Sequence, residues 1–142
     1  MKSTFIKISL VLLLAACSHL SYAQCDKVVT LKSSKTNHLD EKGNIESTKE
    51  EAAVITIGKT QLTIVPGDED HTISGPITSK TCDWTTPFKD GKMVIKAKLE
   101  DNNGKQLECT LTITGVAGKI TLVFQNEENP DKKIMVVADK FE

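Results

Sequence analysis

The sequence predicts an all-β protein: an antiparallel meander of eight or nine strands that forms a small barrel or a barrel-like sandwich. Three observations lead to this fold class. Short runs alternate apolar with polar residues, which is the period of a half-buried strand. Turn signals interrupt these runs about every ten residues, the spacing typical of such folds. Threonine and lysine fall on one face of the runs and aliphatic residues on the other.

The first half of the chain predicts three strands and a polar connection. Residues 27–34 alternate as a first strand, and residues 53–57 and 61–65 flank Gly58-Lys59 as a tight hairpin. The polar stretch 38–51 between them is expected to be an exposed turn or a long hairpin loop. Ser47 and Glu50 have the spacing of a capping box, so a short helix there stays an alternative.

A bulge is expected within the strand that begins near Ile73. Ile73 and Ile77 are odd-numbered, whereas Cys82 and Trp84 are even-numbered, so the inward-facing parity changes between them. One inserted residue produces this change.

The last third predicts a regular meander. Residues 93–99 and 107–113 alternate on either side of an Asn103-Gly104 turn, which favours a hairpin. Residues 115–118 and 129–131 turn the chain twice more. The expected interior residues are aliphatic, with one aromatic: Leu62, Ile64, Ile95, Leu111, Ile120, Leu122 and Phe124.

This pattern, over residues 27–141, resembles the lipocalin-like or calycin group of small barrels. True lipocalins usually carry a glycine-x-tryptophan near the first strand, whereas the only tryptophan here is Trp84. Residues 81–98 and 131–141 also look similar to small uncharacterised exported proteins of Gram-negative bacteria. That resemblance implies a class and no activity.

The N-terminus predicts export. Lys2 and Lys7 precede an apolar run of the length found in a secretory signal peptide. Residues 1–23 are expected to be this signal, leaving 24–142 as a single β domain. The alternative is a lipoprotein signal over residues 1–16, with Cys17 lipidated as the only membrane link. The expected location is the periplasm, the cell envelope or the extracellular space.

Composition argues against nucleic-acid binding. Without the leader the chain has 16 lysines against 19 acids, a net charge of −3, and it has no arginine. Arginine supplies the planar fork that reads phosphates and base edges. One domain of this length also leaves no room for a separate catalytic module.

The cysteines predict a disulfide between Cys25 and Cys82. In a continuous meander one strand separates Cys82 from Cys109, which places their backbones roughly 9 to 10 Å apart. A disulfide spans only about 4.4 to 6.8 Å between Cα atoms. Cys109 is therefore expected to be a small buried hydrophobe.

Catalytic, metal and cofactor sites are not expected. His38 and His71 lack zinc-ligand spacing and are interpreted as solvated surface residues. The acidic runs 68–70 and 127–131 lack the ligand spacing of a calcium loop and are interpreted as charged hairpin tips.

Trp84 and Phe88 are the candidate ligand contacts, because an aromatic pair beside a loop can cap a barrel mouth. The competing interpretation is that Trp84 plugs one end of an aromatic-poor core. The expected function is a non-enzymatic exported module that binds a small apolar or amphipathic ligand. The alternatives are a periplasmic protein inhibitor, similar to bacterial lysozyme inhibitors and projecting residues 38–51, or a purely structural envelope protein.

Overall fold

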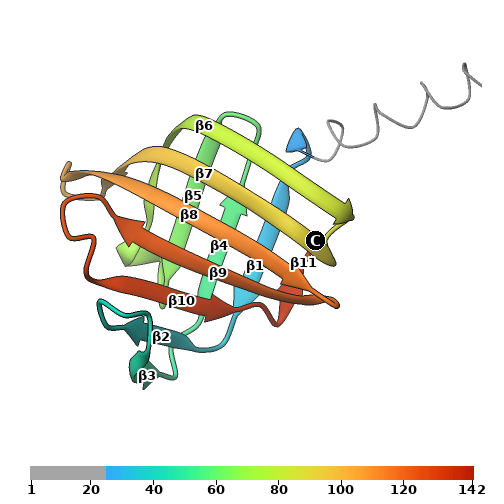
Figure 1. Ribbon diagram of the computed structural model, residues 1–142. Helices are drawn as coiled ribbons and strands as arrows, with labels where there is room; N and C mark the ends of the chain where they lie inside the picture. Colours follow the sequence, from blue (N-terminus) through green and yellow to red (C-terminus); the bar gives the residue numbers. More distant parts are fainter. Residues whose placement is uncertain (1–24) are drawn as a thin grey trace, which may run out of the picture.

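The computed structural model describes residues 25–142, and they form one antiparallel sheet, as the sequence predicted (Figure 1). The predicted signal peptide and the possible lipid site at Cys17 lie outside the described residues. The eleven strands are β1 Val29–Ser33, β2 Thr36–Leu39, β3 Ile45–Lys49, β4 Ala53–Ile57, β5 Gln61–Pro66, β6 Ile73–Thr86, β7 Asp90–Asp101, β8 Gln106–Val116, β9 Lys119–Asn126, β10 Lys133–Val137 and β11 Lys140–Phe141. A 3₁₀ turn, Glu69–His71, joins β5 to β6.

Eleven strands arise from eight runs of chain, because three runs are briefly interrupted. Two or three residues separate β1 from β2, β3 from β4, and β10 from β11. The interrupted runs keep their partners, because the run that holds β1 and β2 pairs with the run of β3 and β4 on one side and with the run of β10 and β11 on the other. β1 pairs with β4, whereas β2 pairs with β3.

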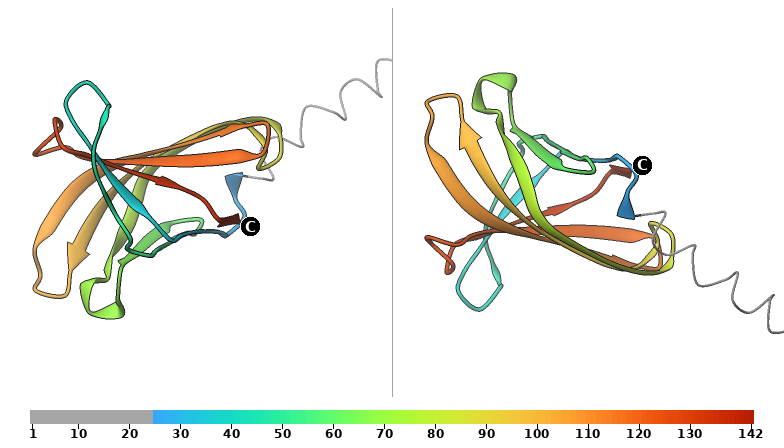
Figure 2. Two further views of the ribbon diagram at one scale, coloured as in Figure 1. Left: turned by 90° about the horizontal axis from the view of Figure 1, so that it is seen from below. Right: turned by 90° about the horizontal axis from the view of Figure 1, so that it is seen from above.

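The sheet coils so that its first and last segments lie side by side (Figures 1 and 2). β11 pairs with β1, and β10 pairs with β2, both antiparallel. The order across the sheet is β11-β1-β4-β5-β6-β7-β8-β9-β10-β2-β3. Its two end strands, β11 and β3, do not pair with each other, so the described sheet is barrel-like rather than one closed ladder.

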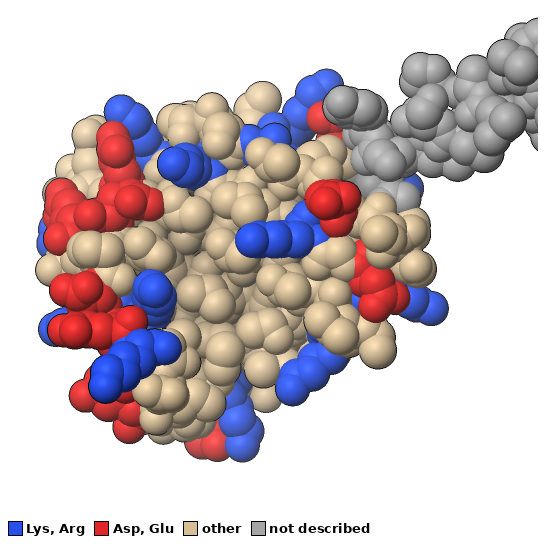
Figure 3. Space-filling view, in the orientation of Figure 1, with Lys and Arg blue, Asp and Glu red and all other residues tan. Residues whose placement is uncertain are grey.

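The core lies on the concave face of the coiled sheet. The expected interior positions from Leu62 to Leu122 are buried, and Phe124 packs partly buried against them. The buried apolar set has few aromatic members, so close packing of aliphatic side chains supplies most of the hydrophobic stabilisation. On the outer face, Figure 3 shows a mainly uncharged centre, with acidic side chains gathered toward the edge that carries the β7–β8 and β9–β10 turns.

The predicted bulge is present in β6. Its pairing with β7 shifts register between Ile77 and Ser79, and again between Trp84 and Thr86. The first shift explains why the inward parity changes between Ile77 and Cys82. Gly75, just before this shift, lies so close to β7 that a Cβ there would be 1.9 Å from the carbonyl oxygen of Lys98.

Two turns show how local chemistry sets the hairpins. Gly104 has a φ of 80°, which a turn between β7 and β8 requires. The β8–β9 turn is tighter than the four residues expected at 115–118. Strand pairing continues to Val116 and Lys119, and only Ala117 and Gly118 turn, with φ values of 51° and 83°.

The expectation for residues 38–51 was correct for an exposed turn and wrong for the rest of the stretch. They hold the end of β2, the whole of β3 and a turn between them, with neither a long loop nor a helix. All five residues of β3 are exposed, so alternation of burial could not mark it as a strand. Pairing with β2 determines its conformation, and the Thr48 hydroxyl reinforces that pairing by donating to Asn37 Oδ1 at 2.7 Å.

Candidate functional site

An apolar cavity of about 260 Å³ opens into the concave face. It lies where β6 begins, and Trp84 lies near the far end of the same strand. Most lining positions belong to the hydrophobic core or pack against it, so the cavity is a partly open recess at the edge of the core. The lining residues are Thr36, His38, Glu51, Ala53, Ile55, Ile64, Pro66, Ile73, Leu122, Phe124, Ile134 and Val136.

Strand register explains how distant residues come to line one wall. Ser47 pairs with His38, His38 with Ile134, and Ile134 with Phe124. Residues directly opposite each other in antiparallel strands share a face. This row therefore crosses β3, β2, β10 and β9 on the concave side.

His38 corrects the sequence interpretation, because it is half-buried and lines the cavity rather than lying in solvent. Its Nε2 atom is buried and has no hydrogen-bond partner among residues 25–142. The nearby Thr36 hydroxyl is already satisfied, since it donates to the backbone oxygen of Glu51 at 3.2 Å. A buried polar atom without a hydrogen-bond partner destabilises the folded state by about 1 to 3 kcal/mol. A ligand group that forms a hydrogen bond with Nε2 would remove this penalty.

A second hollow of about 550 Å³ continues outward from the cavity. It lies between the β2–β3 hairpin and the β9–β10 turn, and it shares His38, Phe124 and Ile134 with the cavity. The rest of its lining is mostly polar: Leu39, Glu46, Ser47, Lys49, Asn126, Asn129, Lys132 and Lys133. The two spaces together form a funnel with a polar entrance and an apolar interior.

Trp84 and Phe88, the residues singled out by sequence, form an aromatic cluster with Phe141. The ring centroids lie 5.3 to 6.2 Å apart, and Phe88 meets both partners edge to face. Trp84 is only 7% exposed, and its Nε1 atom is buried without a hydrogen-bond partner in the described chain. Neither Trp84 nor Phe88 lines the apolar cavity. The cluster fills the concave face where β11 meets β1.

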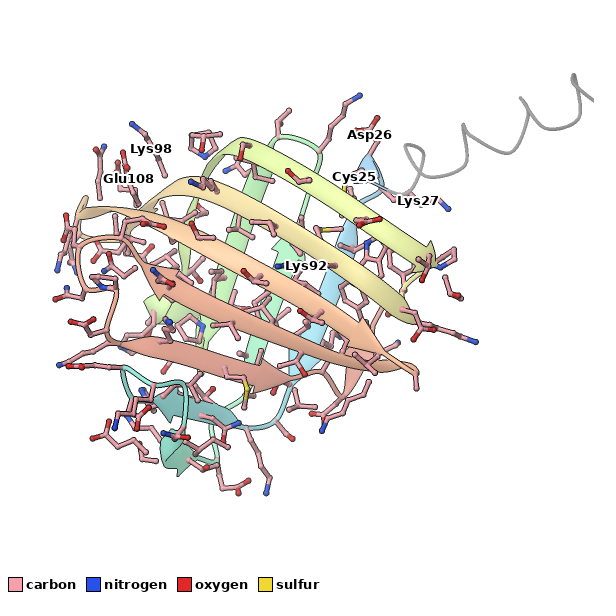
Figure 4. All side chains as sticks on the ribbon, viewed as in Figure 1. Cys25, Asp26, Lys27, Lys92, Lys98 and Glu108 are labelled. Carbon is pink, nitrogen blue, oxygen red and sulfur yellow. A yellow bond between two sulfur atoms is a disulfide. The ribbon has the colours of Figure 1, made fainter. Side chains whose placement is uncertain are left out.

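The structure contains the disulfide expected from the sequence, between Cys25 and Cys82, with a Cα–Cα distance of 5.8 Å (Figure 4). Lys80, two residues before Cys82, also binds the N-terminal segment that holds Cys25. Its ammonium donates to the backbone oxygens of Cys25 at 3.0 Å and Gly58 at 2.7 Å. Desolvation by burial lowers the pKa of Lys80, with Asp26 opposing that effect.

Cys109 is buried and free, and it lies on β8 beyond the intervening strand β7. Burial raises the pKa of its thiol to about 11. The thiolate is the reactive form of cysteine, so this residue behaves as a small hydrophobe at neutral pH.

The remaining polar candidates are surface features. His71 is exposed and pairs with Asp68, with 2.6 Å between His71 Nδ1 and Asp68 Oδ1. Lys98 and Glu108 form a cross-strand ion pair of 2.9 Å on the outer face (Figure 4). Within residues 25–142, histidine, cysteine and acidic side chains do not gather in any group of three that could hold a metal ion.

Comparison of the chain with known proteins gives no match that would assign a function to the site. No protein-family model matches the chain, and neither a curated protein nor a solved structure matches it. Among the described residues no helix is long and apolar enough to cross a membrane.

Proposed function

We propose that this protein is an exported, non-enzymatic module that binds a small, mainly apolar ligand in the cavity beside His38. The observation that carries the proposal is the cavity itself: a partly open apolar space lined mostly by core side chains, with one unpartnered buried polar atom in its wall. Binding sites for small molecules commonly combine apolar walls with a few placed polar groups.

The cavity volume limits the ligand. At about 260 Å³ it lies just below the roughly 300 to 1,000 Å³ typical of drug-sized ligands. A dry protein cavity of about 150 Å³ is large enough for benzene. The expected ligand is therefore a single ring or a short aliphatic chain, and a long-chain lipid would extend into the outer hollow.

The apolar lining predicts how affinity depends on chain length. Each buried methylene contributes about 0.8 kcal/mol, which is close to fourfold in affinity. Two added methylenes would strengthen binding about fifteenfold until the cavity is full.

The test is a titration of the purified protein with butan-1-ol, hexan-1-ol and octan-1-ol, followed by two-dimensional NMR. We expect hexan-1-ol to bind about fifteenfold more tightly than butan-1-ol and to shift the amides of Ile55, Ile64 and Phe124. The Trp84 indole N–H signal is expected to stay in place. Shifts confined to Trp84 and Phe88 would instead place the ligand at the aromatic cluster, and no saturable binding would remove the proposal.

A cavity-filling variant sharpens this test. Ala53 is buried at 6% exposure and lines the cavity, so Ala53→Leu would occupy part of the space. We expect binding of hexan-1-ol to weaken at least tenfold while the fold is retained. Val28→Leu is the control, because Val28 is an exposed residue that does not line the cavity.

A second candidate function, a protein-binding inhibitor, is favoured by the β2–β3 hairpin. The hairpin projects from the body of the sheet (Figure 2), and the outer edge of β3 has no strand beside it in the described chain. An unpaired edge can accept an extended segment of a partner. Native mass spectrometry of protein purified from its host would separate the two functions, since a bound small molecule supports the first and a bound protein the second.

A further inference from the structure

We propose that the ligand is an anion: a short apolar group in the cavity carrying an acidic head that Lys49, Lys132 and His38 hold at the entrance. This inference rests on the proposed function and assigns the chemical class of the ligand. It is carried by the charges of the outer hollow, which differ from those of the domain as a whole.

The outer hollow is positive, although the domain is negative. Lys49, Lys132 and Lys133 line it against a single acid, Glu46. Residues 25–142 as a whole carry three more acids than lysines. The lysines come from two segments that the fold brings together, the end of β3 and the approach to β10.

These lysines have no carboxylate within ion-pair distance among the described residues. Four other lysines of the described chain do, among them Lys35, which lies 2.8 Å from Glu50 between β1 and β2, and Lys98, which lies 2.9 Å from Glu108. The entrance therefore has cationic groups whose charge is not already neutralised by a neighbouring side chain. An anionic head would provide the missing partner.

Register places one of these lysines on the same face as His38, two residues farther along the β2–β3 ladder. Lys49 pairs with Thr36 and Ser47 pairs with His38, so all four side chains share the concave face. Ile134 lies opposite His38 on the other side, and Lys132 is two residues before it. An acidic head beside His38 would thus lie between a lysine of β3 and a lysine of the β9–β10 connection.

Two acids also line the funnel, and their positions are compatible with this proposal. The carboxylate of Glu51 lies toward the β5–β6 connection, since a Cβ on Gly67 would be 2.9 Å from its Oε1. Its charge also contributes to raising the pKa of His71, after larger effects from Asp68. Glu46 is outnumbered three to one at the entrance.

The experiment compares three probes that share one chain and differ in the charge of the head: hexanoate, hexan-1-ol and hexylammonium. Isothermal titration of the purified protein at pH 7 is expected to rank them in that order, with hexanoate about tenfold tighter than hexan-1-ol. Raising the salt from about 0.01 M to about 1 M shortens the Debye length from roughly 30 Å to 3 Å, so hexanoate should lose most of its advantage.

Matched variants locate the charge effect. Lys49→Met with Lys132→Met is expected to weaken hexanoate binding about tenfold and to change hexan-1-ol binding less than twofold. Lys92→Met is the control, because Lys92 is exposed on β7 (Figure 4) and lines neither the cavity nor the outer hollow, so it should change the binding of neither probe. If the double variant does not fold, the probe ranking and salt dependence of the unmodified protein still decide the question.

The outcomes separate this inference from the proposed function. Equal binding of hexanoate and hexan-1-ol, or tighter binding of hexylammonium, would overturn the anionic assignment and leave the cavity as a binding site. Saturable binding of none of the three would overturn both.

Discussion

Removing the disulfide between Cys25 and Cys82 should lower the free energy of unfolding of this domain by about 4 kcal/mol. The bond joins residues 57 positions apart, and closing a loop of that length restricts the unfolded chain by about this amount in the chain-entropy description. For a domain of this size the loss corresponds to a fall in melting temperature of roughly 15 °C. The perturbation is Cys25→Ala with Cys82→Ala, which leaves Cys109 as in the natural chain.

The assay is urea unfolding followed by circular dichroism, with the oxidised wild type, the reduced wild type and the double variant side by side. The reduced protein and the double variant should agree, because both lack the cross-link. Lys80→Met with the disulfide intact is the control for the hydrogen bonds that Lys80 donates to Cys25 and Gly58. If the free energy of unfolding of the double variant lies within about 1 kcal/mol of that of the oxidised wild type, the disulfide does not stabilise the domain by closing this loop.

Two further predictions concern backbone fit and pH. Gly75→Ala should lower the free energy of unfolding by more than about 3 kcal/mol, since its Cβ would overlap the Lys98 carbonyl. Gly104→Ala should lower it by only about 1 to 2 kcal/mol, because the alanine would have to adopt a positive φ. Equal losses for the two variants in urea unfolding would contradict this distinction. The hydrogen bond that His71 Nδ1 donates to the Asp68 carboxylate raises the pKa of His71 above 6.5, so this histidine's contribution to stability is present below pH 6.5 and lost as pH rises through the folded-state value. The pKa of Asp68 is lowered below 3.8 by the same bond, so its contribution is present above pH 3.8 and lost as pH falls through the folded-state value. NMR titration should show the His71 pKa returning toward 6.5 in Asp68→Asn, and an unchanged value would show that the pair does not form in solution.

Local patterns in the sequence were sufficient to predict a strand where one of its faces is buried and the other is exposed. Met93 to Leu99 and Cys109 to Ile113 alternate because the sheet has a core side and a solvent side, and this period of two is visible without the fold. The same reasoning located the bulge in β6 from a parity change. It also excluded Cys82 with Cys109, because a strand between two cysteines sets their separation.

The candidate site depended on contacts that no local pattern contains. His38 lies in a polar stretch, and its half-burial follows from pairing between β2 near the N-terminus and β10 near the C-terminus. Lys49 and Lys132 are far apart in sequence and share one hollow only because the coiled sheet brings the β2–β3 hairpin beside the β9–β10 turn. The sequence pointed instead to Trp84 and Phe88 because aromatic residues are conspicuous, whereas a cavity is a gap between side chains and leaves no mark in the sequence.

The sequence by itself therefore determined the all-β class, most strands, the bulge and the exclusion of a Cys82–Cys109 disulfide, because these follow from side-chain period, turn chemistry and the spacing between strands. The structure decided that Cys82 pairs with Cys25. Tertiary structure alone decided that β3 is a strand, that Phe141 joins Trp84 and Phe88, and that a positive entrance leads to an apolar cavity beside His38. The aromatic cluster and the entrance depend on pairing between chain segments distant in sequence, which only the coiled sheet sets. The strand β3 depends on pairing with β2, because its exposed side chains carry no burial pattern.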